Sequence, residues 1–168
     1  TNAGVCTMCE RGGFYADTTG RIGSTSHCAC NPCKNGTWSS EAGASDPNED
    51  CEVCPSGTKT DAPAGYRACA CLDDFSRTDR FGACSSCTGI VGIDCVADAR
   101  VLQKGYFWVY PTPAQEHGYL SFTDDLQHES GYNASLAFFN GSYPPVYACP
   151  FEKNCLGVTK ESAAACLE

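Results

Sequence analysis

Large aliphatic side chains are scarce in the first 94 residues of this 168-residue chain. They are Val5, Ile22, Val53, Leu72, Ile90, Val91 and Ile93. A stretch of this length with so few core-forming residues cannot offset its conformational entropy by hydrophobic burial alone. Covalent cross-links or bound ions must therefore supply part of the stability of residues 1–94.

Positive charge is also scarce, with 11 Lys and Arg against 20 Asp and Glu and a formal net charge of -9. Binding to phosphate groups needs clustered positive charge, so nucleic acid is excluded as a partner. The same shortage excludes a polybasic contact with a membrane surface. No apolar run approaches the roughly 18 residues of a spanning helix, so we expect no direct membrane insertion.

Cysteine, in contrast, is abundant: the chain has 15, and CxxC occurs four times. The four pairs are Cys6/Cys9, Cys30/Cys33, Cys51/Cys54 and Cys84/Cys87. Such pairs bind zinc in intracellular ribbons and form disulfides in secreted domains. Disulfides are favoured, because the CxC pairs Cys28/Cys30 and Cys69/Cys71 do not fit the ligand spacing of a zinc knuckle. A thioredoxin-like redox role is disfavoured, because there is no βαβ pattern around a CxxC.

Three N-glycosylation sequons support the same compartment. They are Asn35-Gly36-Thr37, Asn133-Ala134-Ser135 and Asn140-Gly141-Ser142. In a cysteine-rich acidic chain they indicate an extracellular, secreted glycoprotein. We expect Asn35, Asn133 and Asn140 to lie on exposed turns and to carry N-linked glycans.

The cysteine-rich part has an internal period. Cys9, Cys30 and Cys51 are evenly spaced, and the same interval separates Cys33 from Cys54. Each of the first three CxxC pairs is followed by a glycine and then an aromatic residue or threonine, in Gly13-Phe14-Tyr15, Gly36-Thr37-Trp38 and Gly57-Thr58. Short repeats of this kind stack into a rod in which each unit touches its neighbours. The Gly, Pro, Ser, Asp and Asn between them predict turns and two-stranded ribbons with almost no helix.

These residues resemble a known family. The pattern Cys51-Glu-Val-Cys54-Pro55-Ser-Gly-Thr58, then Gly65, Cys69-Ala-Cys71, Phe75-Ser-Arg77 and Cys84, resembles the cysteine-rich module of ephrin-type tyrosine kinase receptors. Such modules are similar to epidermal growth factor-like and tumour necrosis factor receptor-like repeats, and the resemblance covers about residues 6–87. It implies the growth factor-like pairing Cys33–Cys54, Cys51–Cys69 and Cys71–Cys84. Nothing resembles a kinase or an ephrin-binding domain.

The remaining residues differ in composition, so we predict two parts: tandem cysteine-rich modules over 1–94 and an aromatic-rich domain with few cysteines over 95–168. The motifs Gly105-Tyr106-Phe107-Trp108 and Tyr143-Pro144-Pro145-Val146-Tyr147-Ala148-Cys149-Pro150 resemble a segment that follows such repeats in large uncharacterised extracellular proteins. Residues 101–110 read as a β-strand ended by Pro111 and Pro113. We predict a short helix or strand over residues 119–126 and another over residues 135–139.

Helix signals in this part are few. Ser121 or Thr123 could cap a helix that runs through Leu126. Three consecutive alanines predict a further helix over residues 160–167. The predicted fold class is therefore small, disulfide-rich and mostly β and loop, with a small β-containing domain at the C-terminal end.

The aromatic run over residues 106–110 has two interpretations. It is either the core of the second part or a surface that is buried against another molecule, because aromatic residues are enriched at interfaces. A hydrophobic strand with free edges also invites pairing with another chain. For the second interpretation, the interface residues are Phe107, Trp108 and Tyr110.

No catalytic constellation is evident. The histidines are His27, His117 and His128, and the carboxylates near the last two form no HExxH-like motif. Ser121 and Ser130 lack the glycines of a nucleophile elbow. The acidic run over residues 46–52 suits calcium chemically but lacks the ligand alternation of an EF-hand loop, so a solvated loop is favoured. Asp73, Asp74 and Asp79 are interpreted in the same way.

The sequence thus predicts a non-enzymatic extracellular glycoprotein without a metal or other cofactor. Its expected role is structural or adhesive, as a self-assembling subunit of a matrix, coat or filament. Its expected partners are copies of itself or other extracellular proteins. The alternative is a piece of a receptor ectodomain that binds a protein ligand. Because 15 is odd, at least one cysteine has no partner within the chain.

Overall fold

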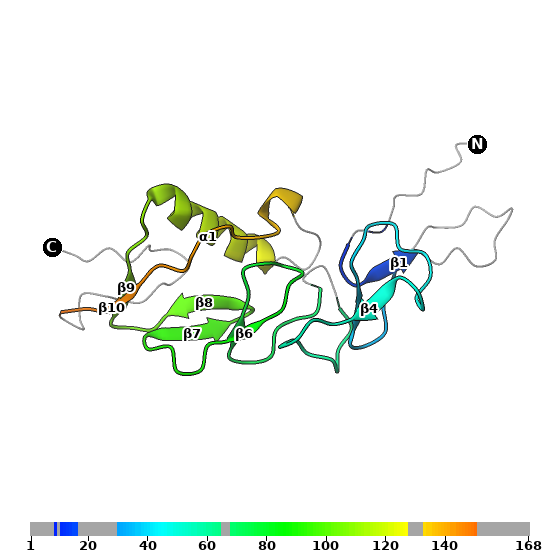
Figure 1. Cartoon of the computed structure of the whole chain (residues 1–168), viewed down its shortest axis with the longest axis horizontal. Coiled ribbons are helices and arrows are strands. Elements are labelled where there is room, and N and C mark those ends of the chain that lie inside the picture. Colours follow the sequence, from blue (N-terminus) through cyan, green and yellow to red (C-terminus); the bar gives the residue numbers. More distant parts are fainter. Residues whose placement is uncertain (1–8, 10, 17–29, 65–67, 128–132, 151–168) are drawn as a thin grey trace, which may run out of the picture.

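The computed structural model describes residues 9, 11–16, 30–64, 68–127 and 133–150. Within these ranges the chain forms short strands, one α-helix and one turn of 3-10 helix, η1 (Ala134–Leu136). The elements are spread along one long axis, with β1 and β4 towards one end and α1, β9 and β10 towards the other (Figure 1). The prediction of a small, disulfide-rich fold made mostly of strands and loops is confirmed.

The described strands form five two-stranded antiparallel sheets. The pairs are β1 (Phe14–Ala16) with β2 (Cys30–Pro32), β3 (Thr37–Ser39) with β4 (Cys51–Val53), β5 (Phe75–Ser76) with β6 (Ser85–Ser86), β7 (Ile93–Val96) with β8 (Ala99–Leu102), and β9 (Tyr106–Trp108) with β10 (Val146–Ala148). Strands this short cannot be stable alone, so each ribbon depends on a disulfide or on packing against a neighbour.

The sequence repeat corresponds to a structural repeat. In three successive units a glycine carbonyl accepts a hydrogen bond from the residue three positions beyond a cysteine. The bonds are Cys33 N to Gly13 O, Cys54 N to Gly36 O and Leu72 N to Gly57 O, at 2.7–2.9 Å. Gly57 has a φ of +78°, and a Cβ there would lie 2.4 Å from the carbonyl oxygen of Cys84. A side chain is therefore excluded at this position.

Five disulfides join cysteines that follow one another along the described chain. They are Cys9–Cys30, Cys33–Cys51, Cys54–Cys69, Cys71–Cys84 and Cys87–Cys95. The bond Cys71–Cys84 is the one that the family resemblance implied. The implied bonds Cys33–Cys54 and Cys51–Cys69 are wrong. The interlaced order would cross two loops, whereas in this fold each repeat closes its own loop before the next begins.

Residues 101–110 do not form the single strand that the composition predicted. Strand β8 ends at Leu102, the chain turns at Gln103–Gly105, and β9 begins at Tyr106. Gly105 has a φ of +87°, a conformation that favours glycine. A turn signal inside an apolar run was thus stronger than the β-propensity of its neighbours.

Helix α1 (Pro113–Leu126) is longer than predicted and begins elsewhere. Its cap is Thr112, whose Oγ1 accepts a hydrogen bond from the Gln115 amide at 3.3 Å, and Pro113 occupies the first helical position. Proline is favoured there because that amide has no partner within a helix. Ser121 and Thr123 lie inside the helix and do not cap it. The helix predicted over residues 160–167 lies outside the described residues.

Two small clusters of buried side chains form the hydrophobic core. The first contains Trp38, Cys54, Ala64, Ala68, Cys69 and Phe81. The second contains Tyr119, Phe122, Leu126 and Phe139. Trp38 stacks on Phe81 with ring centroids 5.5 Å apart, which ties β3 to the middle of the chain. None of the described helices is long and apolar enough to cross a membrane.

Two buried ion pairs join the cysteine-rich part to the aromatic part. Arg77 contacts Asp98 in the β7–β8 turn, with Nη2 to Oδ2 at 2.5 Å, and both side chains are almost fully buried. Arg80 contacts Asp125 at the end of α1, with Nη2 to Oδ2 at 3.0 Å. Strand β7 itself spans the boundary predicted between residues 94 and 95. Packing is therefore continuous across that position.

We predict that Asp98→Asn destabilises the protein by about 3–5 kcal/mol, because the change removes the carboxylate charge that faces the buried Arg77 guanidinium. Urea denaturation under non-reducing conditions measures the effect. Asp73→Asn is the matched control, since Asp73 pairs with Lys59 on the surface and its side chain is 91% exposed. The control should unfold close to the wild type. Equal unfolding midpoints for Asp98→Asn and the wild type would contradict the prediction.

Candidate functional site

The aromatic ribbon formed by β9 and β10 carries most of the predicted interface. Phe107 lies opposite Tyr147 and Trp108 opposite Val146 in the antiparallel register. Because side chains alternate across a strand, Tyr106 and Trp108 share one face and Phe107 the other. The ribbon therefore has an inner and an outer face.

The inner face packs on the rest of the protein. Trp108 meets Tyr119 of α1 edge-on, with ring centroids 5.5 Å apart. A Cβ on Gly92 would lie 2.4 Å from Tyr106 Cδ1, so the absence of a side chain at Gly92 lets the Tyr106 ring approach the backbone. Trp108 is half-buried by these contacts. It belongs to the edge of the second core cluster.

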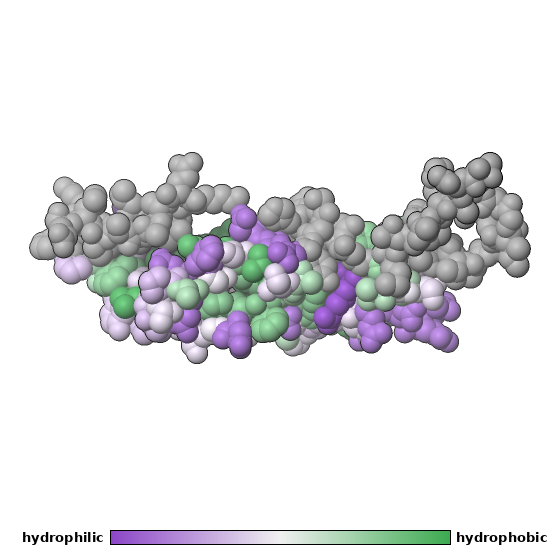
Figure 2. Space-filling model, turned by 90° about the horizontal axis from the view of Figure 1, so that it is seen from above, coloured by the Kyte–Doolittle hydropathy of each residue, from purple (hydrophilic) through white to green (hydrophobic). Residues whose placement is uncertain are grey.

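The outer face retains exposed apolar surface. Phe107 contacts Tyr147 with ring centroids 5.6 Å apart, and Tyr147 is 48% exposed. Val109 is 51% exposed, and Phe138, elsewhere on the surface, is 58% exposed. Figure 2 shows hydrophobic residues gathered over the half of the molecule that holds α1 and the last strands, with hydrophilic residues predominant at the opposite end.

The structure thus separates the three predicted interface residues. Phe107 lies on the outer face, whereas Trp108 and Tyr110 pack against the Tyr119 cluster. Tyr147 was missed by sequence reasoning, although it lies directly opposite Phe107. The alternation in Val146-Tyr147-Ala148 was the available signal, but only pairing with β9 identifies its partner.

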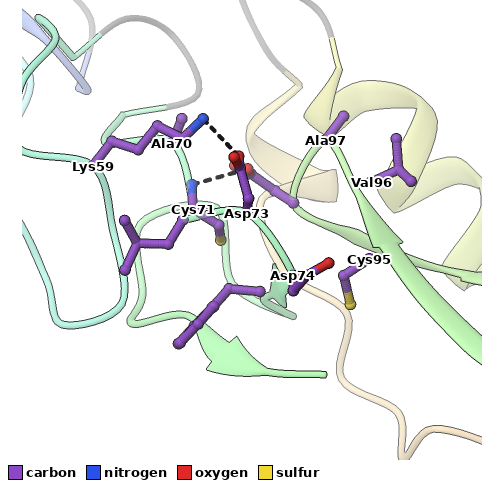
Figure 3. A pocket seen from close by; sticks show the side chains of 11 residues that line it. Lys59, Ala70, Cys71, Asp73, Asp74, Cys95, Val96 and Ala97 are labelled. Carbon is purple, nitrogen blue, oxygen red and sulfur yellow. Dashed lines mark hydrogen bonds and ion pairs between the residues drawn. The ribbon is translucent and has the colours of Figure 1, made fainter. Parts of the chain in front are cut away.

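A pocket of about 250 Å³ lies between the third repeat and the β7–β8 hairpin (Figure 3). Its lining includes Lys59, Asp73 and Asp74, the disulfide cysteines Cys71 and Cys95, and Asp98. Lys59 Nζ contacts Asp73 Oδ1 at 2.9 Å, and this ion pair raises the pKa of Lys59. Nothing in the sequence pattern indicated this pocket, because its walls come from segments brought together by disulfides.

Asp98 also lines the pocket, and both of its carboxylate oxygens have partners. Its Oδ1 accepts a hydrogen bond from the Cys71 amide at 2.9 Å, and its Oδ2 contacts Arg77. Asp98 has a φ of +71° and its neighbour Ala97 a φ of +48°. The contacts of the carboxylate hold this strained turn, so Asp98 serves the fold rather than a ligand.

The three sequon asparagines are all exposed. Asn35 Nδ2 donates a hydrogen bond to the Asp61 carbonyl at 3.0 Å. Asn133 caps η1, and its Oδ1 accepts hydrogen bonds from the Ser135 amide and hydroxyl at 3.0 and 2.8 Å. Asn140 follows the buried Phe139 and lies on the surface.

The structure places several other polar residues that the sequence singled out. His117 is exposed on α1, and Asp125 binds Arg80, while His27 and His128 lie outside the described residues. In the acidic run, hydrogen bonds from the backbone amides of Asp46 and Ser45 lower the pKa of Asp50. Across the described ranges, no group of three or more His, Cys, Asp and Glu side chains is arranged to hold a metal ion.

The eleven cysteines of the described ranges are all in disulfides, including every described member of a CxxC pair. Cys149 is among them, and Cys6, Cys28, Cys155 and Cys166 lie outside these ranges. Comparison of the chain with known protein families, curated proteins and solved structures finds no match. The resemblance to ephrin-receptor modules stays a prediction.

Alkaline pH should destabilise the fold through its buried tyrosines. Burial is the main cause that raises the pKa values of Tyr110, Tyr119 and Tyr143 above the ordinary value of about 10. Above pH ~10 the unfolded phenols lose protons that the folded ones keep, so the free energy of unfolding falls as pH rises. Below that pH the stabilisation is fully present. Urea unfolding at several alkaline pH values measures the slope.

Tyr119→Phe provides the control, because it keeps the ring and removes the phenol proton. This variant should lose less stability than the wild type between neutral and alkaline pH. The variant lacks the two hydrogen bonds that the Tyr119 hydroxyl makes with the Arg100 backbone, so it is less stable at all pH values, and the slope rather than the midpoint is compared. Identical slopes for the two proteins would count against the prediction.

Proposed function

We propose that this chain is a non-enzymatic extracellular glycoprotein with a structural or adhesive role. It acts as a subunit that assembles with copies of itself into a matrix, coat or filament. The disulfides indicate an oxidising compartment, and the three exposed sequon asparagines are compatible with glycosylation there. The elongated arrangement of small repeats suits a spacer or building block better than an enzyme that needs an enclosed cavity.

The outer face of the aromatic ribbon is the observation that carries this proposal. Val109 and Tyr147, which are exposed, and the partly buried Phe107 form an apolar patch at one end of an acidic molecule. Exposed apolar surface of this kind marks sites of protein–protein contact. Because the opposite end is different in character, a contact from one end to the other is heterologous. A heterologous contact that does not close produces a filament.

Assembly can be tested with Tyr147→Ser, which removes an exposed aromatic side chain from the outer face and leaves Trp108 in place. We expect this variant to associate at least about tenfold more weakly than the wild type, because aromatic side chains are enriched among the few contacts that carry most of the binding energy. Light scattering over a range of protein concentrations measures association, and electron microscopy shows whether filaments form.

Leu72→Ser is the matched control, since Leu72 is 44% exposed, close to the value for Tyr147, but lies beside the pocket. It should associate like the wild type. A wild-type protein that stays monomeric at every concentration would overturn the assembly proposal and favour the alternative of a ligand-binding receptor segment.

Glycosylation gives a second, independent test. Protein made in a secretory host should carry N-glycans at Asn35, Asn133 and Asn140, because each asparagine is exposed. Peptide mass spectrometry before and after glycosidase treatment identifies the occupied sites, and Asn48, an asparagine without a sequon, serves as the negative control. An unchanged mass after treatment would remove this support for secretion.

A further inference from the structure

Two disulfides border the pocket, and they differ in accessibility. Cys71 and its partner Cys84 are both buried, with exposed fractions of 3% and 7%. Cys95 also lines the pocket but is only partly buried, whereas its partner Cys87 is 5% exposed. Figure 3 shows Cys95 beside the pocket with Asp74 nearby. A reagent that enters the pocket therefore meets Cys95 before Cys87.

Polar groups behind Cys87 can stabilise it as a leaving thiolate. The Ser76 hydroxyl lies 3.3 Å from Cys87 Sγ. Arg100 Nε donates a hydrogen bond to Ser76 Oγ at 3.2 Å, which polarises that hydroxyl and brings a positive charge close to the sulfur. Hydrogen bonds and nearby guanidinium groups lower the pKa of a thiol, and a thiol of lower pKa leaves faster in disulfide exchange.

We propose that Cys87–Cys95 is a thiol-exchange site that reacts with small thiols through the pocket. An incoming thiolate attacks Cys95 Sγ, so a sulfur–sulfur bond forms between the reagent and Cys95 while the Cys87–Cys95 bond breaks. Cys87 leaves as a thiolate, accepts a hydrogen bond from Ser76 and then takes up a proton from solvent. One disulfide is exchanged for another, so the step needs no separate oxidant or reductant. This inference goes beyond the proposed structural role and does not depend on it.

The fold around the bond can survive its opening. The β7–β8 hairpin is also held by the Arg77–Asp98 ion pair and by the bond from the Cys71 amide to Asp98. On its other side, the Arg100 amide and carbonyl both bond to the Tyr119 hydroxyl at 3.0 Å. The Cys87–Cys95 loop spans a sequence separation of 8, the shortest of the described disulfides. Its opening releases correspondingly little chain entropy.

The charges of the pocket select among thiols. Lys59 pairs with Asp73, and Asp98 pairs with Arg77. Asp74, exposed in the lining, is in none of the ion pairs found among the described residues. Its negative charge attracts a cationic thiol and repels an anionic one. The preferred reagent is therefore a small thiol that carries an amine and no carboxylate.

The experiment uses the full chain after N-ethylmaleimide has blocked any free thiol, and cysteamine or glutathione as the probe in non-denaturing buffer. Samples are alkylated at timed intervals, digested and analysed by mass spectrometry. We expect cysteamine on Cys95 and an alkylated Cys87, formed at least about tenfold faster than Cys71–Cys84 opens. Cysteamine should react faster than glutathione, and Asp74→Asn should reduce that preference.

Ser76→Ala tests the role of the hydroxyl, with Ser85→Ala as the control on the paired strand. Relative to the opening of Cys71–Cys84 in the same molecule, exchange at Cys95 should slow by about threefold or more in Ser76→Ala and stay unchanged in Ser85→Ala. The proposal is overturned if the probe attaches to Cys87, if the two disulfides open at equal rates, or if Ser76→Ala exchanges as fast as the wild type. It is also overturned if exchange occurs only together with global unfolding.

Discussion

Closure of each short loop by its own disulfide is the constraint on which this structure depends. The described bonds join successive cysteines with sequence separations of 21, 18, 15, 13 and 8, so the loops follow one another and do not interlock. In the chain-entropy model a loop of about 15 residues contributes roughly 3 kcal/mol. This contribution stands in for the hydrophobic core that residues 1–94 are too poor in aliphatic side chains to build. Only one or two residues separate each described loop from the next, and the loops follow one another along the long axis of the molecule.

The cysteine-rich part and the aromatic part are joined by buried polar contacts. Arg77 and Arg80 lie three residues apart in one short segment. Arg77 pairs with Asp98 in the β7–β8 turn, and Arg80 pairs with Asp125 at the end of α1. Buried ion pairs add little net stability, but the loss of one partner is costly, so they fix a single arrangement of the two parts. The pocket between Lys59 and Asp98 follows from this arrangement. The ribbon on which the proposed assembly depends is held at one end of the molecule by aromatic packing against the Tyr119 cluster.

Agreement with the sequence-based expectations depends on how local each signal was. The disulfide-rich class and the repeat follow from cysteine and glycine spacing alone, and the turn glycine Gly57 has the backbone conformation that such a repeat needs. The start of α1 was missed because Pro111 and Pro113 were interpreted as the end of a strand, although a threonine before a proline is also typical of a helix start. The strand over residues 101–110 was wrong for a related reason: Gly105 turns the chain inside an apolar run.

Composition and spacing by themselves determined that this chain is stabilised by disulfides, that it is built from short repeats and that its apolar residues concentrate near the C-terminal end. These properties depend on residues close together in the sequence. The tertiary structure alone decided which cysteines pair, because cysteines such as Cys33, Cys51 and Cys54 are chemically equivalent and only the folded path brings two sulfurs together. It also decided that Tyr147 faces Phe107 and that Cys95 borders a pocket, since both depend on contacts between distant segments.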